Sequence, residues 1–312
     1  MLKYVLMRIV WLFFILMVVM TVLFFALGFV ETRRLDVTLL ERIIMIHADY
    51  RRYLFVIATE WDWGVTKYNW PVWDELLRRS GFTIRLNAIA LVFYTVFGFV
   101  FGILGALYKG RLFDRIIGLF ILVFSSVPAF VMVLMLILVF GYTLEWLPPQ
   151  DAFTGGWWME VKKLIIPVLS ISALPLARFT RVIRGEMIEA FYSDYILLLR
   201  TKGLKTRKII THHLIKDCSV PLLPQVLPMV IYTIVGSFIV ESVYGTSGMS
   251  RWLFNSLFGF SSGAAFVDVN PPSVMMIGVF LTFITLVIGL IVDILYAVLD
   301  PRIRLGSKKA SV

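Results

Sequence analysis

Six long apolar segments alternate with polar ones along this chain of 312 residues. Most of them are long enough to cross the hydrocarbon core of a bilayer as an α-helix, which takes about 20 residues. The apolar segments are 9–30, 86–108, 116–144, 164–177, 218–240 and 269–292. This pattern predicts an all-α polytopic membrane protein with six transmembrane helices.

The fourth segment, 164–177, is short for a membrane span and contains two prolines. The neighbouring regions 109–115 and 178–216 are both strongly basic, and basic loops stay on the cytoplasmic side. An even number of crossings must therefore lie between them. We expect the fourth helix to cross the membrane and to include Trp157 and Trp158 at its outer end.

The distribution of Lys and Arg predicts the topology. Eighteen of these residues fall in regions that six helices place on one side, and three fall in the two short loops on the other side. The long segment 31–82 does not count, because long translocated segments escape the positive-inside rule. We therefore expect a multi-pass protein of the cytoplasmic (inner or plasma) membrane with both termini in the cytoplasm.

The same pattern divides the chain into four parts. Residues 1–30 form an N-terminal tail and the first transmembrane helix, and residues 31–82 form an extracytoplasmic cap, expected to be small and folded. Residues 83–304 form a core of five helices with a cytoplasmic loop at 184–217, and residues 305–312 form a cytoplasmic tail.

Composition agrees with a membrane protein and excludes several functions. The chain is 60% hydrophobic and 16% charged, with a mean hydropathy of +0.88. The net charge of +10 is spread between apolar segments, so we expect contact with membrane lipid and no nucleic-acid partner. The one cysteine, Cys218, cannot form an internal disulfide, and no Cys/His spacing indicates a metal site. No phosphate-binding G-x-x-x-x-G-K-[ST] motif is present, so we expect no cofactor, and any ATP must be bound by partner subunits.

Prolines indicate two places where transmembrane helices bend. Pro128 follows two serines in the third segment and predicts a kink, which serves packing or gating. Pro221, Pro224 and Pro228 crowd the first half of the fifth segment. We expect them to share one helix face, to interrupt its hydrogen bonds repeatedly and to supply a hinge.

The segment 189–221 is the longest basic insert between apolar runs, and it has a helical pattern on both sides of one glycine. Asp194, Tyr195 and Ile196 lead through leucines to Arg200 and Lys202. Gly203 follows and tolerates a positive φ, which makes it a helix stop. A second basic run follows, so the insert is predicted to form a helix, a break and a second helix. Its charges alone are equally compatible with a loop that only fixes topology.

This insert resembles the EAA loop of permease subunits of ABC importers, most closely in the oligopeptide, dipeptide and nickel subfamily. The matching positions are Asp194, Tyr195, Ile196, Arg200, Lys202, Gly203, Leu204, His213 and Pro221. The sequence departs from the family pattern at 197–199, where leucines replace small residues, at Leu214 and at Lys216-Asp217.

Two further stretches carry the same resemblance. The end of the chain, from Asp293 to Arg304, reads D-I-L-Y-A-V-L-D-P-R-I-R and matches the family pattern almost residue for residue. Glu241 and Gly248 lie in a stretch that resembles the family's E-T-V-F…P-G-L-G-R, with Ser247 in place of the proline.

The resemblance implies the fold of a type I ABC importer permease and a pore-forming role, without catalytic residues. It implies that residues 194–196, 200 and 202–204 contact an ATPase. We expect Pro128, the three prolines of the fifth segment, Glu241 and Gly248 to act in gating. It also implies two ATP-binding cassette subunits, an extracytoplasmic substrate-binding protein, and a second permease chain that is usually unlike the first. Peptides, nickel and glutathione all remain open as substrates, as does a homodimeric pore.

Two other classes of function are weaker alternatives. An ion-coupled secondary transporter needs ionisable groups near the bilayer midplane, whereas Glu241 and Asp293 lie at the ends of segments. Residues 245–248, G-T-S-G, match a short motif of intramembrane serine proteases, but no histidine lies in the sixth segment to act as base.

Overall fold

The computed structural model describes residues 2–32, 36–151, 155–215, 220–261 and 264–299. The chain forms two compact units. The first consists of residues 1–84 and 246–290, and the second of residues 85–245 and 291–312. The helices α3 (Val72–Leu107) and α12 (Pro271–Leu299) contribute residues to both.

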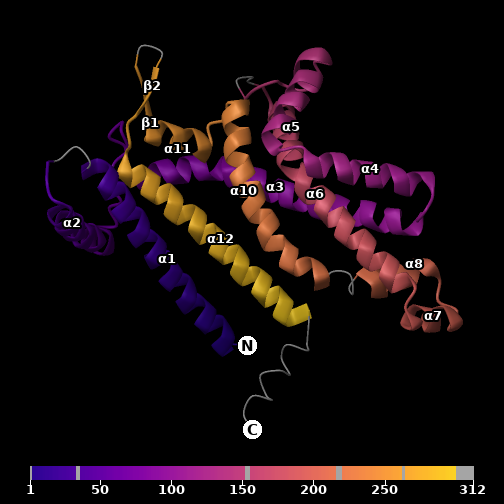
Figure 1. Cartoon of the computed structure of the whole chain (residues 1–312). Coiled ribbons are helices and arrows are strands. Elements are labelled where there is room, and N and C mark those ends of the chain that lie inside the picture. Colours follow the sequence, from indigo (N-terminus) through magenta and orange to yellow (C-terminus); the bar gives the residue numbers. More distant parts are fainter. Residues whose placement is uncertain (1, 33–35, 152–154, 216–219, 262–263, 300–312) are drawn as a thin grey trace, which may run out of the picture. The chain divides into compact units, whose positions relative to one another are not determined.

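Helices from both ends of the chain form the core of the first unit. Here α1 (Leu2–Glu31) runs beside α12 (Figure 1), and Met20 packs with Met275 and Val279. The two helices approach closely because Gly278 has no side chain: a Cβ there would lie 2.6 Å from Cδ1 of Leu23. The other elements are α2 (Leu39–Glu60), α11 (Met249–Leu257), β1 (Phe258–Ser261) and β2 (Ala264–Val267).

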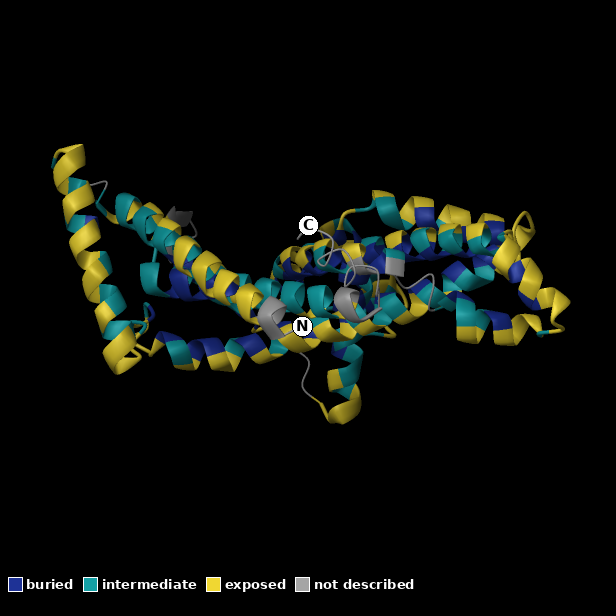
Figure 2. Ribbon diagram, turned by 90° about the horizontal axis from the view of Figure 1, so that it is seen from below, coloured by how far each residue is buried: buried dark blue, intermediate teal, exposed yellow. Residues whose placement is uncertain are grey.

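The region expected to be a small folded cap contains one long helix, one turn and the first turns of α3. A capping box begins α2, because Thr38 accepts from the backbone N–H of Glu41 while the Glu41 carboxylate accepts from that of Thr38. These hydrogen bonds hold the pKa of Glu41 below its usual range. Within α2 only Ile46 is buried, so most of this helix is exposed (Figure 2).

The second predicted span is longer than the apolar run 86–108, because α3 begins at Val72. Asp74 and Glu75 lie in its first turn, where a helix dipole favours negative charge. Glu75 also pairs with arginines one turn later. The helix therefore starts in a polar sequence that hydropathy alone assigned to the cap.

A short hairpin was missed by the sequence analysis. β1 and β2 pair antiparallel, with Phe258 opposite Val267 and Ser261 opposite Ala264. Lys67 holds this hairpin to the turn before α3: its ammonium pairs with the Asp268 carboxylate at 2.9 Å and donates to the Phe258 carbonyl at 3.3 Å.

In the second unit, α6 (Trp157–Phe191) is the central helix. In its most apolar stretch, 72% of the residues are buried. Three helices pack against it, which are α4 (Leu112–Ser126), α5 (Ala129–Leu136) and α10 (Leu223–Tyr244). The helix begins at Trp157, as predicted, and keeps both of its prolines inside one continuous element. The short fourth segment is thus the middle of a long helix.

Glycines allow α3 to pack tightly against α6. A Cβ on Gly98 would lie 2.8 Å from Cβ of Phe179, and one on Gly102 would lie 2.6 Å from Cβ of Ile183. These two glycines are four residues apart and therefore share one helix face. Close contact between the helices depends on the absence of side chains there.

The third predicted span is not one kinked helix. α4 ends at Ser126, and α5 with the π-helix η2 (Ile137–Thr143) leaves at 109° to it. Val127 and Pro128 both have extended backbones, which stops helical hydrogen bonding between the two parts. The described residues thus contain five helices long and apolar enough to span a membrane, and a sixth span if the bent pair counts as one.

Candidate functional site

The basic insert folds as two short helices around a glycine turn, as predicted. α7 (Asp194–Thr201) is followed by Gly203 at φ +75°, then by α8 (Thr206–Ile209) and the π-helix η3 (Ile210–Leu214). The Gly203 N–H donates to the Arg200 carbonyl at 2.9 Å and closes the end of α7. We call Asp194–Leu214 the coupling segment.

One face of the coupling segment is anchored in the core of the second unit. Ile196, Leu199, Ile209 and Leu214 are buried in the same cluster as Met187 of α6. Ile196 was expected to contact an ATPase, but its side chain is fully buried in this chain. It anchors α7 instead, because the apolar positions of the helix face inward at intervals of three residues.

The opposite face of α7 is exposed and mixes apolar with cationic side chains. Tyr195 is 43% exposed, Leu197 61% and Leu198 54%. Arg200 and Lys202 are exposed at the end of the same helix. Of the remaining predicted contact residues, Asp194 is exposed in the first turn and Leu204 is half-buried beyond the glycine. The leucines that depart from the family pattern at 197 and 198 therefore enlarge an exposed apolar patch.

Aromatic side chains hold cationic ones around this segment. The Arg200 guanidinium lies 6.0 Å from the Phe191 ring centroid, and Lys109 Nζ lies 4.9 Å from the ring of Tyr192. The rings of Tyr195 and His213 pack edge to face, with 6.0 Å between their centroids. Such contacts restrain long side chains that would otherwise be free to rotate.

An ion pair missed by the sequence analysis connects α6 to the start of α4. Arg184 donates from Nε and Nη2 to the two carboxylate oxygens of Asp114, at 2.6 and 2.9 Å. Asp114 also accepts from the backbone N–H of Gly110 at 2.9 Å. Arg184 was counted above only among the basic residues that predict the topology. Its charge is paired with Asp114, a residue far away in the sequence.

The prolines of the fifth segment do not all interrupt one helix. Pro221 lies in the 3-10 turn η4 (Val220–Leu222), and Pro224 lies in the first turn of α10, where no N–H bond is lost. Only Pro228 lies inside α10. The expected repeated interruption is therefore reduced to one position, since the helix begins later than the apolar run. Cys218 lies outside the described residues.

The last two predicted gating residues occupy different elements. Glu241 is fully buried in the last turns of α10, and Gly248 precedes α11 as its N-cap with an extended backbone. Gly245, at φ +78°, ends α10, and it was not singled out from the sequence. Beside it the Tyr244 hydroxyl donates to the Pro148 carbonyl at 2.7 Å. Residues 245–248 thus form a connection between helices, and the Ser247 carbonyl accepts from Arg79.

Comparison with known proteins identifies the family. The model of the binding-protein-dependent transport system inner membrane component matches residues 98–305. The dipeptide transport system permease protein DppB of Lactococcus lactis is 32% identical over 76% of this chain and 73% of that protein. The oligopeptide transport system permease protein OppB of Mycobacterium bovis is 33% identical over 80% of this chain and 78% of that protein.

A solved structure shows the same fold. The inward-facing MetNI methionine ABC transporter contains a chain that aligns with a TM-score of 0.54 and 15% sequence identity, over 72% of this chain and 96% of that one. The fold is that of a type I ABC importer permease, and the family match covers the bent pair, the coupling segment and α10. The chain therefore belongs to the family of binding-protein-dependent transport system inner membrane components, the permeases of ABC importers.

Proposed function

We propose that this chain is a pore-forming subunit of an importer that moves dipeptides, oligopeptides or similar small solutes across the cytoplasmic membrane. The relatives named for dipeptide and oligopeptide transport support this substrate class. The family is that of binding-protein-dependent transport systems, which argues against both the secondary transporter and the protease. In this proposal the subunit itself catalyses no reaction, and partner subunits bind and hydrolyse ATP.

The proposed assembly contains two ATP-binding cassette subunits, a second permease unlike this one, and an extracytoplasmic substrate-binding protein. The charge asymmetry supports an orientation with the coupling segment and both termini in the cytoplasm. In that orientation the turn at 61–71 and the region from α11 to β2 face outward.

The single observation that carries the proposal is the two-sided character of α7. Its inward face is locked into the α6 core through Ile196, while its outward face offers Leu197 and Leu198 beside cations. An ATPase cleft that covered the outward face would bury apolar area and pair the charges. Movement of that cleft would then be passed to α6, because the inward face allows no independent sliding of α7.

The test is the variant Gly203→Val. A Cβ at Gly203 would have no neighbour within 4 Å, so any effect comes from the positive φ and not from a clash. Left-handed backbone costs an L-residue about 1–2 kcal/mol, which is enough to redirect the chain between α7 and α8. We expect a folded protein that loses both co-purification of the ATPase and peptide uptake.

Gly81→Val is the matched control. A Cβ at Gly81 also meets nothing within 4 Å, but this glycine lies inside helix α3 and has no positive φ. The control should keep both the ATPase and uptake. Retention of both by Gly203→Val would show that the coupling segment is only a topological loop.

A further inference from the structure

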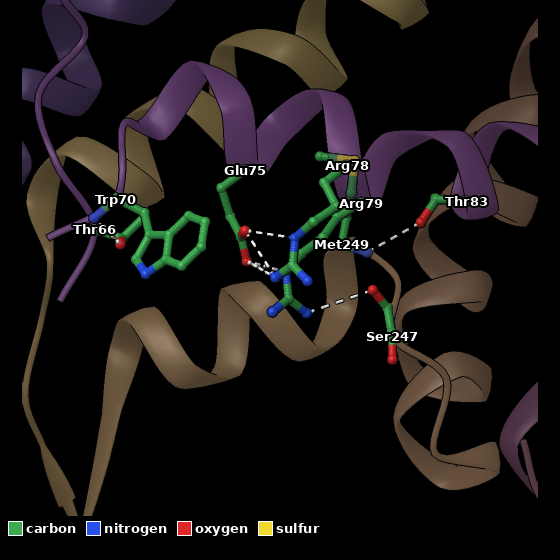
Figure 3. A network of polar contacts seen from close by, with 8 residues as sticks. All are labelled: Thr66, Trp70, Glu75, Arg78, Arg79, Thr83, Ser247 and Met249. Carbon is green, nitrogen blue, oxygen red and sulfur yellow. Dashed lines mark hydrogen bonds and ion pairs between the residues drawn. The ribbon is translucent and has the colours of Figure 1, made fainter. Parts of the chain in front are cut away.

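A cavity of about 380 Å³ lies in the first unit, and none of its lining residues belongs to the coupling segment. It is lined by the turn before α3, the first turns of α3 and one side of α11. Its volume falls within the range of small-molecule sites, about 300–1,000 Å³. Figure 3 shows five of its lining residues, which are Thr66, Trp70, Glu75, Arg78 and Arg79.

The cavity has an excess of positive charge. Glu75 is its one lining carboxylate, and it accepts hydrogen bonds from both Arg78 and Arg79 (Figure 3). One negative charge therefore faces two guanidinium groups. Lys67 also lines the cavity but is paired with Asp268, so the uncompensated charge belongs to the arginines.

Arg78 has donors to spare. Its Nε and Nη2 bond to Glu75 at 2.9 and 2.8 Å, while its side chain remains 65% exposed. Arg79 is more enclosed and donates to the Ser247 carbonyl from Nη1 at 3.4 Å. Glu75 thus fixes the guanidinium groups in place, and Arg78 can still donate to an anion. A planar guanidinium is the preferred partner of a carboxylate.

Aromatic side chains also line the cavity. Trp252 of α11 is only 3% exposed, and its indole Nε1 is buried without access to the cavity, so this residue contributes an apolar wall and no donor. Tyr68 and Trp70, which are both exposed, continue the aromatic lining.

We propose that this cavity binds the C-terminal carboxylate of a short peptide. The carboxylate accepts from Arg78, and the apolar side chain of the last peptide residue lies against exposed Trp70 and Tyr68. The ammonium end of the peptide points out of the cavity, toward the opening. Such a site recognises the terminal charge shared by all free peptides and does not discriminate between peptide sequences.

The peptide ligand and the outward position of the cavity rest on the proposed function and on the charge-based topology. Direct binding separates the two proposals, since none of the cavity residues belongs to the coupling segment. Full-length protein in lipid nanodiscs would be titrated by calorimetry with alanyl-phenylalanine and with its C-terminal amide. We expect the free acid to bind and the amide to bind at least about tenfold more weakly, the value of one charged hydrogen bond.

A variant with a matched control tests the guanidinium. Arg78→Gln removes the charge while Arg79 still holds Glu75, and it should weaken binding of the free acid by about tenfold. Arg51→Gln changes the same residue type outside the cavity lining and should leave the affinity unchanged.

Several results would overturn the proposal. They are no binding of the free acid, equal binding of acid and amide, or wild-type affinity in Arg78→Gln. Docking of the substrate-binding protein that is lost in Arg78→Gln, without peptide binding to the wild type, would assign the arginines to a protein contact instead. Retention of both the ATPase and uptake by Gly203→Val would refute the proposed role of the coupling segment but would leave these titrations unaffected.

Discussion

Replacing Gly102 by alanine should force α3 and α6 apart. The new Cβ would lie 2.6 Å from Cβ of Ile183 and 3.2 Å from the backbone nitrogen of Arg184. Carbon atoms in contact are about 3.5–4.0 Å apart, so the helices must separate by roughly 1 Å. Rotation of side chains cannot relieve the clash, because both partners are fixed to the backbone.

The magnitude follows from two opposing effects. Overpacking of this kind costs about 1–3 kcal/mol, whereas replacing a helical glycine by alanine returns about 1 kcal/mol. Gly118 of α4 supplies the reference, since a Cβ there meets nothing within 4 Å and only the favourable effect remains. Gly102→Ala should therefore be about 1–3 kcal/mol less stable than Gly118→Ala.

Thermal unfolding in mild detergent, followed by tryptophan fluorescence, would measure this difference. At about 2–4 °C per kcal/mol for chains of this order of size, Gly102→Ala should unfold several degrees below Gly118→Ala. Gly98→Ala should lie between them, because its closest contact is 2.8 Å and its closest backbone atom is 3.6 Å away. A midpoint for Gly102→Ala equal to or above that of Gly118→Ala would refute the close packing of α3 on α6.

Three further predictions concern other parts of the molecule. Pro228→Ala should stiffen α10 and lower peptide uptake when the protein is present in the membrane at its normal level. Replacing Pro221 and Pro224 together should leave uptake near wild type, and equal effects would mean that the position inside the helix is unimportant. In a Cys218→Ser background, Lys205→Cys should resist a membrane-impermeant thiol reagent in intact cells while exposed Tyr68→Cys reacts, and the reverse pattern would invert the topology. Asp114→Asn should destabilise the protein by about 1–3 kcal/mol in the same thermal assay, because Arg184 then loses its charged partner; an unchanged midpoint would show that the pair contributes nothing.

Elements with a strong local signal could be predicted from the sequence. The long apolar helices, the stop at Gly203 and the start of α6 at Trp157 all depend on hydropathy or on glycine conformation. The resemblance in the basic insert identified the family because those positions are read directly from the residues. Parity of the basic loops also identified the fourth span, which its own length would not have supported.

Features that depend on tertiary contacts could not be predicted in this way. The start of α3 at Val72 is accompanied by ion pairs of Glu75 with two arginines, and these pairs form only in the folded helix. The 109° bend at Pro128 exceeds a proline kink, since Val127 also leaves the helical conformation. Burial of Ile196 instead of its exposure to a partner follows only when α7 is placed against α6. The hairpin of β1 and β2 has no apolar periodicity to reveal it.

The exposed leucines of α7 have a consequence for biosynthesis. In the proposed orientation, Leu197 and Leu198 face the cytoplasm. An uncovered apolar surface there attracts other unfolded chains and proteases. A copy of this protein made without its ATPase would carry that surface throughout its lifetime. The cell would then have to match synthesis of the two subunits or destroy the surplus, and the half-life of the orphan chain should lengthen when both leucines become serine.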